Sequence, residues 1–416
     1  MLSADEARNV IFKSVREFQT ETIALADTHD RILAVDVYAQ DDIPPFRNSS
    51  MDGFAIRSSD TGGATKQKPL SVKIQMEVAA GDSPGAALEA HQAIRILTGA
   101  PLPEGADAVI PLEDVEERDG VVILSETVAA GKNTRDRGED MKKGDLVLRR
   151  GMKIGAAHFG TLASMGCSSV EVFRIPRMAI LTTGNELVPV SENPTNGKIR
   201  NSNAYSLFAL ARESGCEPVD LGVARDSQEE TLKKIKEGLQ YDLLVTSGGI
   251  SVGKYDYVLD SMKKAGVVLK FWKVNIKPGK PLAFGIYDRG EQRVPVFCLP
   301  GNPVSTVVTF LEYVRPSVEK MMAGEADRAP VYLKATLEEP LSKHDDKKHF
   351  HRGIARNKDG RLYVRSTGNQ SSGVLSSLVK ANCLIILSEQ QSRFEQGDEV
   401  DIELLPWTDV HHLNSF

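Results

Sequence analysis

Apolar and polar positions follow different periods in different stretches of the chain. Between residues 174 and 326, short apolar runs alternate with segments in which apolar residues recur every three or four positions. The runs predict strands at 178–182, 218–224, 243–246, 267–271, 282–286 and 294–299, and the periodic segments predict helices at 203–214, 227–239, 258–264 and 303–322. This alternation predicts a mostly parallel sheet with helices on both faces, a three-layer α/β core.

The stretches before and after residues 174–326 have patterns typical of β structure rather than of alternating strands and helices. Glycines punctuate short apolar runs between residues 44 and 140, which is typical of a small β-rich domain inserted in the chain. After residue 326, short strands at 332–337, 352–356, 362–365, 383–387 and 399–404 predict a small antiparallel sheet or barrel. The predicted domains are a linker and helical domain (1–43 with 141–173), the inserted β-rich domain (44–140), the α/β core (174–326) and the C-terminal β domain (327–416).

Composition narrows the class of protein. A chain of 416 residues with 41% hydrophobic and 26% charged residues is typical of a soluble globular protein of several domains. The net charge of -6 argues against a nucleic-acid partner, and no apolar run approaches the length of a membrane span. The cysteines are scattered without C-x-x-C spacing, which favours reduced thiols and a cytoplasmic location.

The stretch YDLLVTSGGISVGKYD, residues 241–256, is the first candidate for chemistry. A buried strand ends at a glycine-rich loop, where backbone N–H groups can face an anion. The loop supplies Ser247, Gly248, Gly249 and Ser251 as candidate binding residues, and Asp256 follows where a helix begins. On this stretch alone, an ordinary β–α turn is an equally good interpretation.

Two later loops favour a binding site. IKPGKP places Lys277 and Lys280 between prolines, which suits a phosphate or oxyanion, and LPGNP places Pro300 and Pro303 at a rigid turn that opens a helix. In an open α/β sheet, loops at the carboxyl ends of the strands share one crevice. We therefore expect these loops to meet.

Acidic residues follow the same rule. Glu186, Asp226 and Asp256 each come directly after a predicted strand, which favours one acidic cluster over separate surface charges. In the inserted domain, Asp52 and Thr98 sit in polar turns, and either turn alone is more often structural than functional.

The charged loop NTRDRGED, residues 133–140, has two interpretations. It is either a solvated loop, or Arg135 and Arg137 bind an anion beside a metal-binding Asp140.

Taken together, these motifs carry a resemblance. The segments NSSMDGFA, RILTGAPLPEGADAVI, RGEDMKKGD, LTTGNEL, VTSGGISVGKYD, IKPGKP and LPGNPVS, in this order, resemble the MoeA-type molybdopterin molybdenumtransferases, a family that includes the E domain of gephyrin. The likeness runs over nearly the whole chain. Two positions depart from the usual pattern: Asn185 stands where the family often has aspartate, and Ser371 where relatives often carry glycine.

The resemblance implies an activity, an assembly and a set of residues. The family inserts molybdate into adenylylated molybdopterin with release of AMP and a requirement for Mg²⁺, as an elongated homodimer with a site shared between subunits. Contact with a molybdopterin adenylyltransferase is a further expectation. The implied catalytic acids are Asp52, Asp140, Glu186, Asp226 and Asp256, with Glu186, Asp226 and Asp256 as metal ligands. The implied binding residues beyond the glycine loop are Thr98, Arg135, Arg137, Lys277, Lys280, Pro300, Pro303, Arg352 and Ser372.

Two other functions remain open on the sequence. One is molybdopterin adenylyltransferase, whose single domain resembles the α/β core; the flanking β domains argue against it. The other is a non-catalytic scaffold that binds a receptor peptide, as gephyrin does; the intact acidic positions argue against that. The sequence leaves the choice between molybdate and tungstate open, because the two oxyanions are nearly alike in size and charge.

Overall fold

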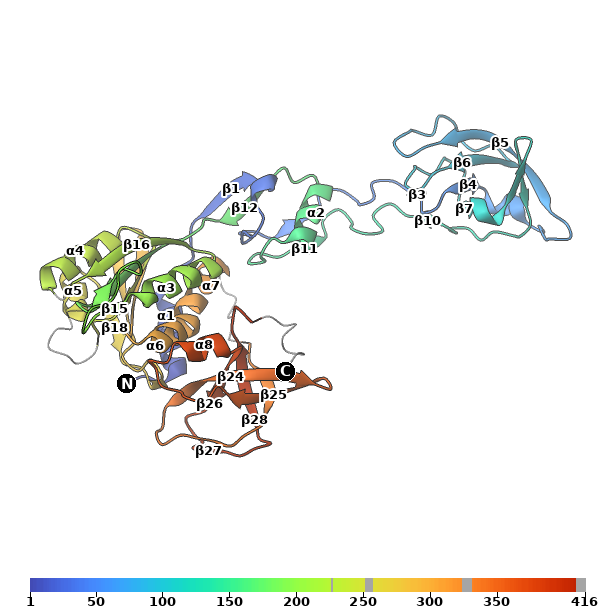
Figure 1. The fold of residues 1–416 in the computed structure, drawn as a ribbon. Coiled ribbons are helices and arrows are strands. Elements are labelled where there is room, and N and C mark those ends of the chain that lie inside the picture. Colours follow the sequence, from blue (N-terminus) through green and yellow to red (C-terminus); the bar gives the residue numbers. More distant parts are fainter. Residues whose placement is uncertain (226, 251–256, 324–330, 409–416) are drawn as a thin grey trace. The chain divides into compact units, whose positions relative to one another are not determined.

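The computed structural model describes residues 1–225, 227–250, 257–323 and 331–408 (Figure 1). The protein divides into two compact units, one made of residues 1–21 and 172–416 and the other of residues 22–171. The chain leaves the first unit in β1 (Thr20–Ala24) and returns in β12 (Ser169–Phe173). The four-domain division expected from the sequence is finer than these two units and stays a prediction.

A six-stranded sheet forms the centre of the first unit. In spatial order its strands are β16 (Glu217–Ala224), β13 (Arg177–Thr183), β17 (Leu243–Ser247), β21 (Gln292–Leu299), β20 (Ala283–Arg289) and β18 (Val268–Trp272). The first four are parallel, whereas β20 and β18 run antiparallel to their neighbours. The turn between β20 and β21 is too short for the crossover that a parallel pair requires.

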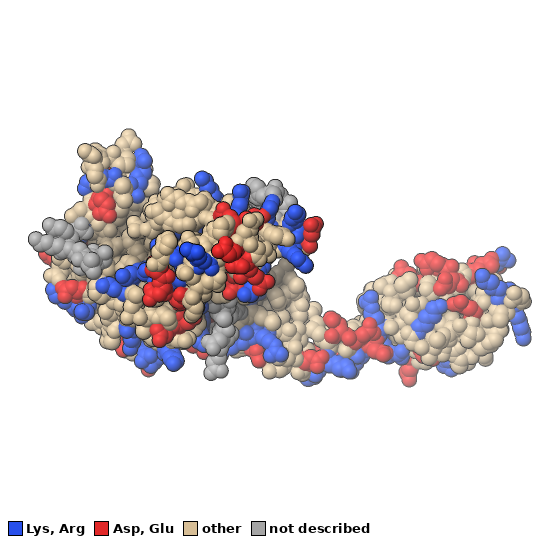
Figure 2. Space-filling view, turned by 90° about the horizontal axis from the view of Figure 1, so that it is seen from below, with Lys and Arg blue, Asp and Glu red and all other residues tan. Residues whose placement is uncertain are grey.

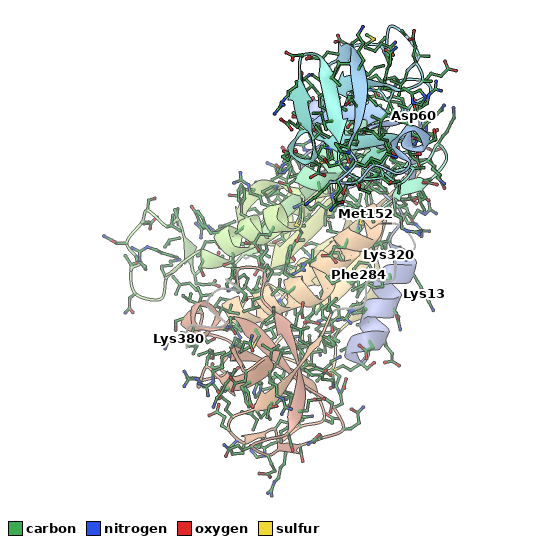
Figure 3. All side chains as sticks on the ribbon, turned by 90° about the vertical axis from the view of Figure 1, so that its right-hand side faces the viewer. Lys13, Asp60, Met152, Phe284, Lys320 and Lys380 are labelled. Atoms are coloured by element: carbon green, nitrogen blue, oxygen red, sulfur yellow. The ribbon has the colours of Figure 1, made fainter. Side chains whose placement is uncertain are left out.

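Helices cover both faces of this sheet, which confirms the three-layer prediction. The helices are α3 (Ser202–Glu213), α4 (Gln228–Gly238), α5 (Val258–Lys264), α6 (Pro303–Thr309) and α7 (Arg315–Ala323), and a π-helical segment (Phe310–Val314) joins the last two. The apolar side chains of α4 and α5 pack together on one face, as Ile235 and Met262 do against Leu244 and Val296. Phe284 is fully buried, with its ring centroid 4.9 Å from that of Phe297, whereas Lys13 and Lys380 are exposed (Figure 3).

The N-terminal helix α1 (Ala4–Ser14) begins at a capping box, where Glu6 N–H donates to Ser3 Oγ and Ser3 N–H donates to Glu6 Oε2. Its buried Arg8 donates from Nη2 to Glu312 Oε2 at 2.9 Å. Glu312 lies in the π-helical segment and is 1% exposed. We call Arg8, Glu312 and the neighbouring Glu403 the Arg8 cluster.

The electrostatics of the Arg8 cluster follow from its burial. Burial, and after it the nearby Glu403 carboxyl, raise the pKa of Glu312 well above its usual range, although the charge of Arg8 acts in the opposite direction. The cluster therefore joins three segments that are far apart in sequence, through the fixed positive charge of Arg8 and two neighbouring carboxyl groups.

The C-terminal part of the first unit is a closed five-stranded barrel, as predicted. Its strands are β24 (Lys348–Lys358), β25 (Arg361–Ser366), β22 (Leu333–Leu337), β28 (Glu399–Leu404) and β26 (Cys383–Leu387), and β26 pairs back with β24. Short elements complete it: α8 (Ser376–Lys380), and the pair β23 (Leu341–Ser342) and β27 (Arg393–Phe394). The two-residue strand β19 (Ile276–Lys277), which precedes β20 of the central sheet, pairs in parallel with β24 and so links the α/β core to the barrel.

The second unit contains the β-rich stretch. Its six-stranded sheet has the order β7 (Ala108–Pro111), β4 (Gly53–Ile56), β6 (Gln92–Ile96), β5 (Leu70–Val78), β9 (Val121–Leu124) and β8 (Glu116–Arg118). Outside the sheet are α2 (Ala156–Ser164), the pair β2 (Val37–Tyr38) and β11 (Leu146–Leu148), and the pair β3 (Asn48–Ser49) and β10 (Thr134–Arg135).

Charged side chains do not collect by sign on the face shown in Figure 2, where acidic and basic residues are interspersed. In the described part of the chain, no helix is both long enough and apolar enough to span a bilayer.

Candidate active site

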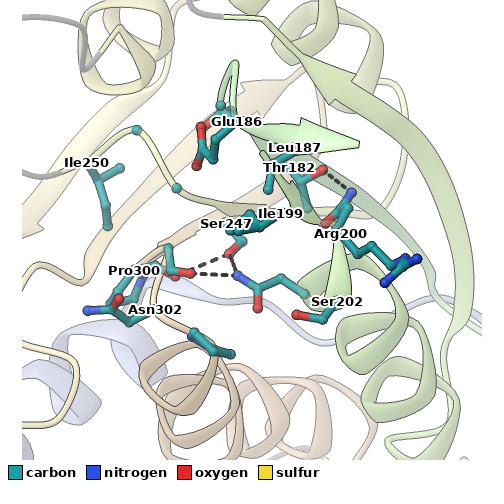
Figure 4. Close-up of a pocket in the computed structure, with 18 of the residues that line it drawn as sticks. Thr182, Glu186, Leu187, Ile199, Arg200, Ser202, Ser247, Ile250, Pro300 and Asn302 are labelled. Carbon is teal, nitrogen blue, oxygen red and sulfur yellow. Dashed lines mark hydrogen bonds between the residues drawn. The ribbon is translucent and has the colours of Figure 1, made fainter. Parts of the chain in front are cut away.

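A cavity of about 490 Å³ opens at the carboxyl edge of the central sheet (Figure 4). Three parallel neighbours, β13, β17 and β21, end at this edge, so the loops that follow them converge there. The lining residues are Thr182, Thr183, Gly184, Glu186, Leu187, Ile199, Arg200, Asn201, Ser202, Asn203, Ser247, Gly248, Gly249, Ile250, Pro281, Pro300, Gly301, Asn302 and Pro303. The predicted convergence of the glycine loop with Pro300, Pro303 and Glu186 is therefore present.

The loop after β17 requires its glycines. Gly248 and Gly249 adopt φ values of 96° and 65°, in the left-handed region that favours glycine. A Cβ atom on Gly248 would lie 2.7 Å from the carbonyl oxygen of Thr183, which is closer than real side chains approach. This tight fit against the end of β13 brings the backbone of the loop to the cavity wall.

Hydroxyl and amide groups join the end of β17 to the loop that follows β21. The amide nitrogen of Asn203 donates to Ser247 Oγ at 2.9 Å and to the carbonyl oxygen of Gly301 at 2.8 Å. Ser247 Oγ in turn lies 3.2 Å from the carbonyl oxygen of Pro300 and 3.3 Å from Thr306 Oγ1. We call Asn203, Ser247, Thr306 and the carbonyl groups of Pro300 and Gly301 the floor network. The Ser247 hydroxyl, predicted to bind substrate, is engaged within this network.

The start of α3 is held by a separate asparagine. Asn201 accepts from Ala204 N–H through its Oδ1 atom at 3.3 Å, which caps the helix, and donates to Thr182 Oγ1 at 2.8 Å. The short parallel pair β14 (Leu187–Val188) and β15 (Ile199–Arg200) forms the adjoining wall. Ile199 is 56% exposed there and gives this wall an apolar side chain beside Arg200.

Glu186 is the predicted metal ligand that the structure places in the cavity. Its carboxylate packs against Gly184, where an added Cβ atom would overlap Oε2. The other two predicted ligands, Asp226 and Asp256, and the candidate Ser251 lie outside the described residues. Within residues 1–225, 227–250, 257–323 and 331–408, no group of three His, Cys, Asp or Glu side chains is placed to hold a metal ion. An exposed carboxylate beside a backbone without a Cβ atom fits a hard cation such as Mg²⁺.

The two predicted lysines lie outside the cavity wall, to which their loop contributes Pro281. Lys277 is exposed, and its Nζ lies 3.9 Å from Asp345 Oδ2 in the C-terminal part of the unit. Lys280 is exposed as well.

Arg352 and Ser372 occupy different environments. Arg352 is fully buried, with Nε donating to Ser377 Oγ at 3.1 Å, and burial lowers its pKa to about 10. Ser372 borders the cavity loops: its Oγ accepts from Asn302 Nδ2 at 3.0 Å, and its carbonyl oxygen accepts from Val304 N–H at 3.1 Å. Ser372 thus links the C-terminal barrel region to the loop that opens α6.

The remaining candidates lie in the second unit. Thr98 donates to Asp52 Oδ1 from both Oγ1 and N–H, at 2.7 Å each, and the hydroxyl contact first and the amide contact second lower the pKa of Asp52. Arg135 pairs by backbone with Asn48, four residues before Asp52 along the chain. Arg137 Nε donates to Asp42 Oδ2 at 2.6 Å, and Asp140 is exposed. The structure brings Asp52 and Thr98 into direct contact.

Sequence reasoning missed the residues of segment 200–203 and Thr306. Asn201 and Asn203 flank Ser202 in an N-S-N motif directly before the apolar periodicity of α3 begins. Asparagine at a helix start is a capping signal, and a second asparagine in the first turn, which the cap does not require, could have pointed to the cavity.

Known proteins resemble this chain over nearly its whole length. Family models match residues 2–166 (MoeA N-terminal region, domain I and II), 179–320 (probable molybdopterin binding domain) and 334–405 (MoeA C-terminal region, domain IV). A curated protein named molybdopterin molybdenumtransferase from Haemophilus influenzae is 37% identical over 97% of this chain and 98% of its own length. One of the same name from Staphylococcus epidermidis is 34% identical over 97% of this chain and 95% of its own.

Solved structures give the same result. A molybdopterin biosynthesis MoeA protein from Pyrococcus horikoshii OT3 matches with a TM-score of 0.82 and 29% identity, over 97% of this chain and 100% of that one. The fold and the cavity are those of a cofactor-biosynthesis enzyme with an α/β binding core. The chain belongs to the MoeA family of molybdopterin molybdenumtransferases.

Proposed function

We propose that this protein is a transferase of molybdenum cofactor biosynthesis that inserts molybdate into adenylylated molybdopterin and releases AMP. The observation that carries the proposal is the cavity at the carboxyl edge of the sheet, whose lining residues all lie within the match to the molybdopterin binding domain at 179–320. Its glycine loop presents backbone to an anion, as an adenylate phosphate requires. Its apolar side chains Leu187 and Ile199 suit a flat ring.

Magnesium is the cofactor we propose. Glu186 would hold it from the cavity, with Asp226 and Asp256 as further ligands. When bound, Mg²⁺ offsets the charge of the anions and polarises the phosphoanhydride. For the oxyanion we propose the cations of Lys277, Lys280, Arg352 and Arg135 with Arg137, and the hydroxyl of Ser372, as the binding groups.

The test is reconstitution from purified components. Adenylylated molybdopterin, molybdate and Mg²⁺ should yield AMP and molybdenum cofactor in the presence of the protein, with tungstate in a parallel reaction. Glu186→Gln should still bind adenylylated molybdopterin but release AMP on the order of 100-fold more slowly, since a charge at the reaction centre is lost. AMP release at the wild-type rate by this variant would remove Glu186 from the reaction.

Two alternatives are tested alongside. An adenylyltransferase would consume ATP and molybdopterin without molybdate, and a scaffold would bind a peptide without turnover. The family matches at 2–166 and 334–405, outside the α/β core, argue against the adenylyltransferase.

We also propose a homodimer in which Asp52 and Thr98 act on substrate held by the other subunit's α/β core. The support is the resemblance of the motifs around Asp52, Thr98 and Glu186 to a family of homodimers whose site is shared between subunits. Mixing inactive Asp52→Ala and Glu186→Ala proteins under conditions of subunit exchange should restore about a quarter of the wild-type activity. Proven heterodimers without activity would contradict the shared site.

Contact with a molybdopterin adenylyltransferase, which makes the substrate, and a cytoplasmic location complete the proposal. The free thiols of Cys167, Cys216, Cys298 and Cys383 support a reducing compartment. A pulldown with the adenylyltransferase and fractionation of cells would test these two points.

A further inference from the structure

Asn203 makes an unusual pair of contacts for a residue in the first turn of a helix. One side-chain nitrogen donates both to Ser247 Oγ at 2.9 Å and to the carbonyl oxygen of Gly301 at 2.8 Å. A primary amide carries two hydrogens, so both bonds form at once. The two acceptors belong to different segments: Ser247 is the last residue of β17, and Gly301 lies in the loop after β21.

This amide also sets the direction of the floor network. Because Ser247 Oγ accepts from Asn203, its own hydrogen is directed to Pro300 O or Thr306 Oγ1, at 3.2 and 3.3 Å. Thr306 Oγ1 donates to Pro300 O at 2.6 Å. The hydroxyl groups of Ser247 and Thr306 and the amide nitrogen of Asn203 therefore all have partners within the floor, and the end of β17 is held to the loop after β21.

Capping of α3 does not account for Asn203. The cap is Asn201, whose side chain accepts from Ala204 N–H and donates to Thr182. Asn203 is free of that task, and its side chain lines the cavity.

We propose that Asn203 is a positioning residue, whose amide clamps the β17 and β21 loops so that both contact the same phosphate-bearing substrate. The inference rests on the proposed function of this cavity. Removal of the amide leaves Ser247 Oγ without its donor and Gly301 O without its partner, and the loops separate.

The experiment compares Asn203→Ala, Ser247→Ala, the double variant and Ser206→Ala, a matched polar-to-alanine control on the same helix. Molybdenum transfer is measured as kcat/KM for adenylylated molybdopterin, and amide hydrogen exchange is measured on the free protein. Asn203→Ala should lower kcat/KM on the order of 100-fold, as a small displacement of positioning groups does. Exchange at Gly248, Gly249, Gly301 and Asn302 should accelerate about tenfold, as expected from one lost hydrogen bond.

The double variant should fall no further than the worse single variant, because both remove the same network. Unchanged exchange at these loops in Asn203→Ala, or faster exchange with kcat/KM within about twofold of Ser206→Ala, would overturn the clamp. Faster exchange confined to residues 204–213 would show a role in helix stability and would also overturn it. If the wild-type protein fails to transfer molybdenum, the proposed function fails, while the exchange data still decide whether Asn203 holds the loops.

Discussion

The floor network of the cavity and the Arg8 cluster are two polar assemblies in one compact unit. They differ in charge and in burial. The floor network uses neutral amide, hydroxyl and carbonyl groups that satisfy one another at the edge of an open cavity. The Arg8 cluster buries a fixed charge between segments that are far apart in sequence. Neutral groups can hold loops in place beside an anion without adding a charge of their own. A buried charge holds distant segments together, because removing its partner leaves an unpaired charge in the interior, which is costly.

The largest effect is therefore expected at Arg8. Arg8→Ala leaves Glu312 buried without its cation, and we expect the free energy of unfolding to fall by about 3–5 kcal/mol. Denaturant unfolding, with hydrogen exchange in α1 as a local probe, measures the loss. Lys13→Ala, on the exposed side of the same helix, is the control and should change stability by less than about 0.5 kcal/mol. Similar small losses for both variants would show that the cluster contributes no more than a surface pair.

A steric change in the cavity loop should come next. Gly248→Ala puts a Cβ atom 2.7 Å from Thr183 O at a φ of +96°, and we expect a loss of about 2–4 kcal/mol. Gly197→Ala is the matched control, because it has a φ of +80° with no atom within 4 Å of the added Cβ. It should lose only the backbone part, about 1–2 kcal/mol. Equal losses, measured by thermal unfolding, would mean that the contact with β13 relaxes freely.

Glu312→Gln should cost less than either change, because burial raises the pKa of Glu312 and so makes its charge less costly to remove than the fixed charge of Arg8. We expect a loss of no more than about 1 kcal/mol near pH 5. A raised pKa in the folded state means that the wild-type protein loses stability as pH rises above the unfolded pKa toward the folded one. Glutamine does not titrate, so the variant should gain on wild type between pH 5 and 8. Parallel stability curves over that range would contradict the raised pKa of Glu312.

The smallest effect concerns a carboxylate at the surface. Thr98→Val removes the hydroxyl donor to Asp52 but keeps the backbone N–H donor. The pKa of Asp52 should rise toward its ordinary value without reaching it, because the hydroxyl is the larger of the two contributions. An NMR titration of the carboxyl carbon measures the pKa, and the control Thr98→Ser, which keeps the hydroxyl, should leave it unchanged. An unchanged pKa in Thr98→Val would assign the effect to the backbone.

The sequence predicted the parts of the site that follow from strand and helix periodicity. Ser247, Pro300 and Glu186 each follow an apolar run, and parallel strands place such residues at one edge. It could not predict Asn203, because that contact depends on β21 being the direct neighbour of β17 although three strands and a helix intervene in the chain. Sheet order is set by packing of the whole domain, and a local pattern does not carry it.

The positions of charged side chains were the hardest to predict from the sequence. Lys277 was expected in the cavity from its proline-flanked loop, yet its ammonium group lies near Asp345 on the C-terminal part. The direction of a long exposed side chain depends on neighbours from distant segments, which loop composition does not reveal. The sequence analysis did not single out Arg8, because its burial depends on Glu312, a residue 304 positions away in the chain.

The contact of Ser372 with the cavity loop has a consequence for how the protein is made. Ser372 lies 70 residues after Asn302, to which it is hydrogen-bonded. During synthesis the strands of the core leave the ribosome first and can pair, but the amide groups of Asn302 and Val304 wait for their acceptors until the barrel region has emerged. A nascent chain halted before that point would carry a folded sheet with an unfinished cavity. A segment translated after the core therefore completes the rim of the cavity.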